Sequence, residues 1–189
     1  WWHWQLSKLV RAIEDFVDPR TGSIEGFSSA HGLGIARRLE LASSLDERSR
    51  SGTGARERWE RAAASIADVR ECPQYGGLAL APQLGLLPLG RDPRSGLWEF
   101  AHVLSGEVPE RDAGGSLVFT PESALVLVLL PGGTFWMGAQ ASAPGSPNYD
   151  QLVQSGEGPV HRVRLAPFFL SKYEMTQGQW VRFKGRHPS

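Results

Sequence analysis

The sequence contains very little cysteine: Cys72 is the only one in 189 residues. A single thiol excludes an internal disulfide framework and any metal site that needs several cysteines. Apolar runs are short as well, because the longest, residues 124–130, falls well below the roughly 20 residues that cross a bilayer. The sequence therefore predicts no membrane-spanning segment within the chain.

Neither sign of charge is in excess, since Lys and Arg together number 20 and Asp and Glu together number 20. Nucleic-acid-binding proteins carry a basic patch or stripe, and no such block is present. Between residues 46 and 61, Arg and Glu alternate instead. We therefore expect no nucleic-acid partner. An apolar fraction of 41% and a charged fraction of 21% are typical of a globular protein.

The chain is predicted to have an α+β fold in three parts: a helical module at 1–71, a β-rich connector at 72–123, and the first part of a further domain at 124–189. It begins at Trp1 instead of Met, and residues 185–189 are loop-like. We therefore expect it to be part of a longer protein. Arg far outnumbers Lys and only one Asn is present, a bias associated with GC-rich bacterial genomes.

The helical module is predicted from apolar residues that recur at three- and four-residue steps. The first stripe consists of Trp2, Leu6, Leu9, Val10, Ile13, Phe16 and Val17. Two more helices are expected at about 31–48, capped by Ser28 or Ser29, and at about 53–69. Their inward-facing residues would be Ile35, Leu39, Ala42 and Leu45 in one and Trp59, Ala62, Ala63, Ile66 and Val69 in the other. We expect these helices to pack as an α-hairpin with the third helix across it.

Short strands are predicted after residue 75, where Gly and Pro become frequent. The apolar runs 84–89 and 97–104 flank the turn-rich stretch 90–96, which favours a β-hairpin. The run 124–130 is typical of a strand buried on both faces. A turn at 131–133, with positive φ at a Gly, would then bring 134–138 back as its partner strand.

The last part of the chain is predicted to be a long loop, two strands and a helix. Residues 139–158 are polar and rich in Gly and Pro, and loops of that length are usually functional or mobile. Residues 160–165 alternate in polarity, and 168–170 form an apolar run typical of a buried strand. A helix at 177–184, capped by Thr176, would turn Trp180 and Phe183 inward.

The ordered motifs between residues 127 and 183 resemble the opening of the formylglycine-generating-enzyme domain, also called the sulfatase-modifying-factor domain. That family begins with a hydrophobic strand, a Pro-Gly-Gly turn, Phe-x-Met-Gly, a variable loop, Glu-x-Pro-x-His-x-Val, an aromatic strand and a Glu-hydrophobic-Thr step into a helix. The matching residues are Pro131, Gly132, Gly133, Phe135, Met137, Gly138, Glu157, Pro159, His161, Val163, Phe168, Phe169, Glu174, Thr176 and Phe183.

This resemblance implies a C-type-lectin-like fold with little regular structure. It also implies a parent protein that oxidises a cysteine of an unfolded sulfatase peptide to formylglycine with dioxygen. The family does this with two cysteines that hold copper(I), a soft ion suited to thiolates, and it also binds calcium. Those positions are expected beyond Ser189, so the chain is predicted to hold no cofactor. No catalytic, cofactor-binding or metal-ligating residue is assigned to it.

A second hypothesis is a non-catalytic binding or sensor module attached to a bacterial serine/threonine kinase. Stretches within 75–102 resemble the region that precedes this domain in such kinases, although the chain has no glycine-rich phosphate loop and no His-Arg-Asp loop. A protein or peptide would then be the partner. The sequence assigns no compartment to either candidate.

Two residues are candidates for a chemical role. His161 is interpreted as a hydrogen-bonded structural histidine in the core beside Glu157 or Glu174, in preference to a metal ligand or general base. Glu174 is interpreted as a structural residue in preference to a catalytic carboxylate. The remaining histidines, His3, His31, His102 and His187, lack ligand spacing.

Other features receive structural interpretations. Cys72 has no basic partner nearby in sequence and is expected to be an inert thiol. Trp1, Trp2 and Trp4 are expected to join the apolar stripe and to contact an upstream part of the parent protein, with a ligand platform as the alternative. Residues 32–34 lack the preceding strand and third Gly of a dinucleotide fingerprint. The helices also lack the His-x-x-x-His-x-Glu motif of the related ergothioneine-pathway enzymes.

Overall fold

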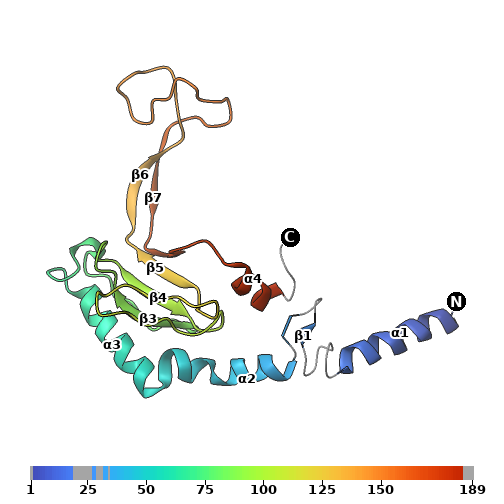
Figure 1. Ribbon diagram of the computed structural model, residues 1–189. Helices are drawn as coiled ribbons and strands as arrows, with labels where there is room; N and C mark the ends of the chain where they lie inside the picture. The colour runs from blue at the N-terminus through green and yellow to red at the C-terminus, as the bar shows by residue number, and fades with distance from the viewer. Residues whose placement is uncertain (1, 19–26, 29–31, 34, 185–189) are drawn as a thin grey trace. The chain divides into compact units, whose positions relative to one another are not determined.

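The computed structural model describes residues 2–18, 27–28, 32–33 and 35–184. The chain forms two compact units, Trp1–Val128 with Leu170–Ser189, and Leu129–Phe169. Helices and antiparallel sheets are both present, which confirms the predicted α+β class (Figure 1). The predicted divisions at 1–71, 72–123 and 124–189 remain predictions.

The first unit contains most of the helical structure. In chain order its helical elements are α1 Trp2–Val17, α2 Ile35–Asp46, the π-helical turn η1 Glu47–Ser51, α3 Thr53–Ala67, the 3-10 turn η2 Pro73–Tyr75 and α4 Gln177–Lys184. A two-stranded ribbon of β1 Phe27–Ser28 and β2 Gly32–Leu33 lies between α1 and α2 in the sequence. The helices predicted at the N-terminus, near 53–69 and at 177–184 are therefore confirmed.

The predicted packing of the helical module is wrong. No described residue of α1 is buried, and Leu39 of α2 is 65% exposed. The buried face of α3, which includes Trp59, Ala62 and Ile66, packs instead on the strand β3 Leu86–Arg91. A sheet face offers a broader apolar surface than a second helix. Ala42 and Val69 are also exposed, and the side chain of Ile35 lies outside the described residues.

The second helix begins later than predicted and ends earlier. Ser29 and His31 lie outside the described residues, and α2 starts only after Gly34, as expected for a helix that Gly disfavours at its start. Its far end continues into the turn η1, where Ser49 is buried. The Ser49 hydroxyl donates to Leu45 O at 2.6 Å and accepts the Gly85 amide at 3.0 Å.

Four antiparallel strands form the main sheet, in the order β3-β4-β5-β8. The other three are β4 Trp98–His102, β5 Val126–Leu130 and β8 Phe168–Ser171. The hairpin β3–β4 confirms the prediction made from the apolar runs around 90–96. Its turn is closed by Asp92, whose backbone amide donates to Leu97 O at 2.8 Å and whose carboxylate accepts the Ser95 amide at 3.1 Å.

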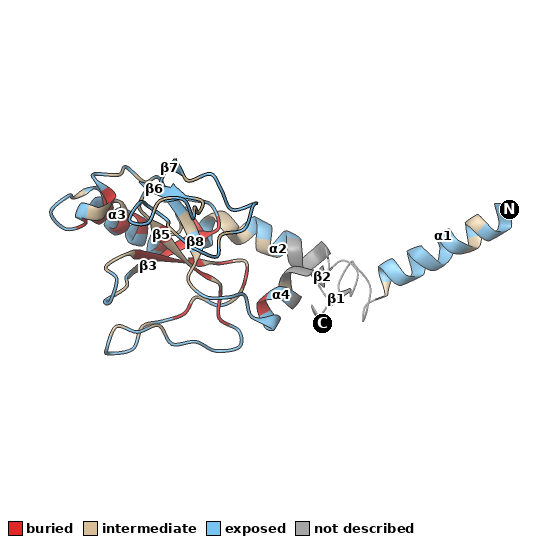
Figure 2. Cartoon of the chain, turned by 90° about the horizontal axis from the view of Figure 1, so that it is seen from above, coloured by how far each residue is buried: buried red, intermediate tan, exposed pale blue. Residues whose placement is uncertain are grey.

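The core lies between α3 and this sheet, where Figure 2 shows buried segments in both. Trp59 and Phe100 are fully buried there, with ring centroids 5.4 Å apart. The indole N–H of Trp59 donates to Ser49 O at 2.7 Å and to Leu86 O at 3.2 Å. Because a buried indole N–H needs a partner, these bonds allow Trp59 to occupy the centre of the core.

The second unit is a ribbon of two antiparallel strands, β6 Gly133–Met137 and β7 His161–Leu165. The prediction that 134–138 pairs with 124–130 is wrong. Neither Gly132 nor Gly133 has a positive φ, so the chain does not reverse in the predicted turn. Gly132 serves a close approach instead, since a Cβ there would lie 2.6 Å from Leu165 O.

The long loop predicted at 139–158 is confirmed, because no helix or strand lies between β6 and β7. Asn148, the only Asn of the chain, has a φ of 56°. Its side-chain amide donates to Trp136 O at 2.8 Å and to Gly138 O at 2.7 Å. Asn is a residue type that tolerates positive φ, and the side chain of Asn148 therefore anchors the loop to the end of β6 by hydrogen bonds.

Burial at the C-terminal strands is lower than predicted. In β5 only Val126 and Leu129 are buried, so burial on both faces is confirmed in part. Phe168 and Leu170 of β8 are 38% and 53% exposed, which contradicts the predicted buried strand. Trp180 is 37% exposed, and the side chain of Phe183 lies outside the described residues.

The start of α4 is as predicted. The Thr176 hydroxyl accepts the Gln179 amide at 3.2 Å, and the Gln179 side chain accepts the Thr176 amide at 3.0 Å. This reciprocal pair is a capping box. Gln179 also donates to Ser123 O at 3.0 Å and is 6% exposed, so the cap ties α4 to the segment before β5.

Candidate functional site

A buried carboxylate lies in the middle of the main sheet. Glu99 of β4 has no exposed surface. One carboxylate oxygen accepts from Arg111 Nη2 at 2.6 Å, and the other accepts from Lys172 Nζ. Lys172 Nζ also lies 3.5 Å from Asp92 Oδ1. Taking an isolated carboxylate out of water is costly, so these two cations make the burial of Glu99 possible.

Two members of this group, Lys172 and Asp92, have shifted pKa values. Burial by itself lowers the pKa of Lys172, but the hydrogen bond and negative charge of Glu99 outweigh it, and the pKa is raised. The pKa of Asp92 is lowered, first by the hydrogen bond from the Ser95 hydroxyl and then by the Ser95 amide and the charge of Lys172. Both shifts move the pKa further from neutral pH, and an efficient general acid or base has a pKa near the working pH, so Lys172 and Asp92 are suited to ion pairing and not to proton transfer.

Side-chain donors also cover the outer edge of β3, the first strand of the sheet order. Three backbone carbonyls of β3 accept hydrogen bonds from long side chains. These bonds run from Trp59 to Leu86 at 3.2 Å, from Arg58 to Pro88 at 3.3 Å and from Arg111 to Leu89 at 3.3 Å. Pro88 itself has no amide to offer. The edge is therefore occupied by the protein's own side chains.

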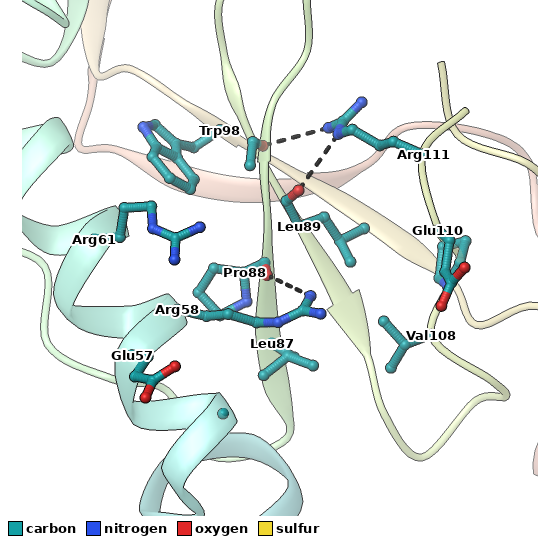
Figure 3. A pocket seen from close by; sticks show the side chains of 13 residues that line it. Glu57, Arg58, Arg61, Leu87, Pro88, Leu89, Trp98, Val108, Glu110 and Arg111 are labelled. Carbon is teal, nitrogen blue, oxygen red and sulfur yellow. Dashed lines mark hydrogen bonds between the residues drawn. The ribbon is translucent and has the colours of Figure 1, made fainter. Parts of the chain in front are cut away.

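A cleft of about 760 Å³ lies beside this edge (Figure 3). One wall is α3 and the other is the segment 108–111, with β3 and Trp98 between them. The lining residues are Gly54, Glu57, Arg58, Arg61, Leu87, Pro88, Leu89, Gly90, Trp98, Val108, Pro109, Glu110 and Arg111. The volume is within the range of small-molecule and peptide side-chain sites.

The cleft carries charge of both signs, and its lining includes no hydroxyl, thiol, imidazole or primary amine side chain. Arg61 makes no hydrogen bond or ion pair with any described residue, and Arg58 uses one nitrogen for Pro88. Glu57 and Glu110 are exposed and form no ion pair among the described residues. No Ser, Thr, Cys, His, Tyr or Lys lines the cleft. The arrangement can bind a ligand through charge and apolar contact, and the carboxylates Glu57 and Glu110 are the nucleophile types in its lining.

The residues that the sequence analysis considered for a chemical role do not form one site. His161 is exposed on β7, and its Nδ1 lies 2.9 Å from Pro159 O, so it is hydrogen-bonded as predicted but does not lie in the core. Alternation placed His161 on one face of β7, but that face is not covered. Glu157 Oε2 accepts the Gln154 amide at 3.0 Å within the loop. Glu174 is exposed and lines a second cavity, of about 320 Å³.

Cys72 is fully buried, with its sulfur 3.4 Å from the Ser65 hydroxyl. Trp2 and Trp4 are 75% and 56% exposed, so the predicted core stripe is wrong for both, and Trp1 lies outside the described residues. His102 is partly buried, and burial lowers its pKa. His3 is exposed, while His31 and His187 lie outside the described residues.

The potential metal-ligating side chains of this chain do not match the metal sites of the formylglycine-generating family. Copper(I) held by two cysteines needs a second thiol, and the chain has one, which is buried. Over residues 2–18, 27–28, 32–33 and 35–184, no three His, Cys, Asp or Glu side chains gather as a metal site would require. Within the same ranges no helix combines the length and apolar character needed to cross a bilayer.

Two comparisons bear on the C-terminal third of the chain. Residues 118–187 match the family model of the sulfatase-modifying factor enzyme 1-like domain. This match confirms the predicted resemblance to the formylglycine-generating-enzyme domain over that segment. A formylglycine-generating enzyme of Thermomonospora curvata is 39% identical over 62 residues, which cover 33% of this chain and 18% of that enzyme. The chain thus matches less than a fifth of its relative's length, and no solved structure matches it.

The sulfatase-modifying factor segment is joined to the residues before it by the Glu99 cluster. Lys172 lies within 118–187, whereas Glu99 and Arg111 precede the segment. The hairpin β3–β4 also supplies two of the four strands of the sheet to which β5 and β8 belong. Sequence reasoning missed this cluster. The available signal was a lone carboxylate, Glu99, inside an apolar run that was predicted to be a strand.

Proposed function

We propose that this chain is scaffold from a protein of the formylglycine-generating type, and that the residues present do not catalyse the oxidation themselves. The observation that carries the proposal is the single thiol. Cys72 is buried and lies outside the family segment 118–187. Oxidation of a substrate cysteine through copper(I) needs soft sulfur donors in the active site, and this chain offers no exposed one.

The parent protein's activity follows from the family resemblance and is part of the proposal. It would be the oxidation of a protein cysteine to formylglycine with dioxygen. In that role β5, β8 and the capped helix α4 supply the frame of the domain. The Glu99 cluster fixes the hairpin β3–β4 to that frame.

The test is an aldehyde assay on the purified chain. A cysteine-containing sulfatase peptide is incubated with the chain, copper and dioxygen, and the product is analysed by mass spectrometry. We expect no aldehyde, whereas the Thermomonospora curvata enzyme, tested in parallel, produces it. Catalytic aldehyde formation by this chain that disappears in Cys72→Ser would overturn the proposal.

The second candidate is a non-catalytic binding or sensor module, attached in its parent to a bacterial serine/threonine kinase. The cleft beside β3 favours this alternative because it presents Arg61, which makes no hydrogen bond or ion pair with a described residue, together with two exposed carboxylates and an apolar floor. A peptide of mixed charge fits that chemistry. Peptides selected on the purified chain should lose affinity in Arg61→Ala, and selected peptides that bind Arg61→Ala equally well would reject the cleft as the site.

A further inference from the structure

Two arginines of α3 project into the cleft beside β3 (Figure 3). Arg58 and Arg61 are three residues apart, and side chains with that spacing are neighbours on one face of a helix. Both residues are exposed. Figure 3 shows both guanidinium groups directed from α3 toward Pro88 of β3. The α3 wall therefore presents two neighbouring cations to a ligand that enters the cleft.

Most hydrogen-bond donors of these two guanidinium groups are unused. A guanidinium has five N–H donors in a fixed planar fork. Arg58 uses one nitrogen, since its Nη1 donates to Pro88 O at 3.3 Å. Arg61 bonds no described residue, although Glu57, four positions earlier, has the spacing of a helical ion pair. The bond to Pro88 thus orients Arg58 in advance, while Arg61 remains available to a ligand.

The other side of the cleft does not attract an anion. Arg111, the third arginine of the lining, donates to the buried carboxylate of Glu99 at 2.6 Å and to Gly115 O at 2.7 Å. Its charge is therefore compensated within the protein. Figure 3 shows Glu110 across the cleft from Arg61, and its carboxylate repels an anion from that wall. An anionic group that enters the cleft is directed to α3.

We propose that Arg58 and Arg61 form an oxyanion site, which binds the carboxylate or phosphate of a peptide side chain in the cleft. The planar fork of Arg matches two oxygens of such a group, so each arginine can donate a pair of parallel hydrogen bonds. Leu89 and Val108, which are half-buried in the lining, offer apolar contact to the residue next to the anion. The inference rests on the second candidate function, because it names the chemical group that the cleft takes.

The test is a titration of the full chain, labelled with nitrogen-15 in arginine, followed by the Nε–Hε signals of Arg58 and Arg61. The probes are acetyl-Leu-Glu-Leu-amide, its phosphoserine and Gln counterparts, and inorganic phosphate. We expect an acidic peptide to shift both signals to saturation, and the Gln peptide to bind about fivefold more weakly, the effect of one exposed ion pair. Tighter binding of the phosphoserine peptide assigns the site to phosphate, and tighter binding of the Glu peptide assigns it to carboxylate.

Variants locate the site. Arg58→Gln and Arg61→Gln should each weaken the tighter acidic peptide about fivefold. Arg56→Gln is the matched control, because Arg56 is exposed on the same helix but does not line the cleft, and it should bind like the parent. Near-ultraviolet circular dichroism of the buried Trp59 and Trp98 verifies that each variant keeps its fold.

The outcomes separate this inference from the function on which it rests. A Gln peptide that shifts the two signals as strongly as the acidic peptides would overturn the oxyanion site and leave the cleft as a peptide site. Inorganic phosphate that shifts them when no peptide does would support the oxyanion site and reject the peptide function. Equal losses in Arg56→Gln and Arg61→Gln would overturn the inference, since the attraction would then come from the charge of the helix as a whole. No shift with any probe would overturn both.

Discussion

Replacing Glu99 by Gln tests the buried ion cluster most directly. The change keeps the shape of the side chain but removes the negative charge that Arg111 and Lys172 share. Breaking a buried pair by removing one partner costs about 3–5 kcal/mol. Arg111 keeps the carbonyl of Gly115, at 2.7 Å, and Lys172 keeps Asp92, at 3.5 Å. We therefore expect the free energy of unfolding to fall by an amount at the lower end of this range, about 3 kcal/mol.

For a chain of this size, such a loss lowers the midpoint of thermal unfolding by about 6–12 °C. The assay is thermal unfolding followed by tryptophan fluorescence, since Trp59 and Trp98 are buried and Trp98 directly precedes Glu99 in β4. Asp46→Asn is the matched control, because it removes one charge from the exposed Asp46–Arg50 pair and should leave the midpoint nearly unchanged. A Glu99→Gln variant whose thermal midpoint equals that of the parent chain would refute the reasoning.

A double-mutant cycle separates lost charge from lost packing. Lys172→Met should cost less in the Glu99→Gln background than in the parent, since there the ion pair is already absent. Equal costs in the two backgrounds would mean that Lys172 and Glu99 do not stabilise each other, despite their contact in the structure.

Three further predictions concern single positions. Burial lowers the pKa of His102, so the folded state binds this proton less readily than the unfolded state. Stability should then fall as the pH drops from about 7 to about 5, and His102→Gln should flatten that slope in urea unfolding; an unchanged slope would contradict this. Thr176→Ala should cost about 1 kcal/mol of unfolding free energy, whereas Thr176→Ser keeps the cap to Gln179; equal losses in both would argue against capping. Gly138→Ala should cost more than about 1 kcal/mol, because φ is 92° and the new Cβ would lie 2.6 Å from a backbone oxygen, whereas Gly133→Ala meets nothing within 4 Å and should be tolerated; equal thermal midpoints would refute this.

The features that the sequence predicted well depend on neighbours along the chain. The hairpin β3–β4 follows from turn residues between two apolar runs, and the start of α4 follows from Thr176 and the residues just after it. The long loop before β7 was likewise evident from its Gly and Pro. The energies that decide such features arise within a few residues, so a short window contains the necessary information.

The features that were missed depend on partners far apart in sequence. Glu99 meets Arg111 across 12 positions and Lys172 across 73. The strand at 133–137 pairs with 161–165 across a long loop, although the strand just before it was the nearer choice. Alternation places His161 on one face of its strand, but only the tertiary structure decides whether anything covers that face.

The three side chains that engage the carbonyls of β3 have a consequence for assembly. In β3, these backbone carbonyls already accept hydrogen bonds. A strand from another polypeptide could use them only after the side chains of Trp59, Arg58 and Arg111 rotate away. Amyloid-like stacking from this side is thereby disfavoured. A strand from another polypeptide would therefore pair more readily with the opposite edge strand, β8.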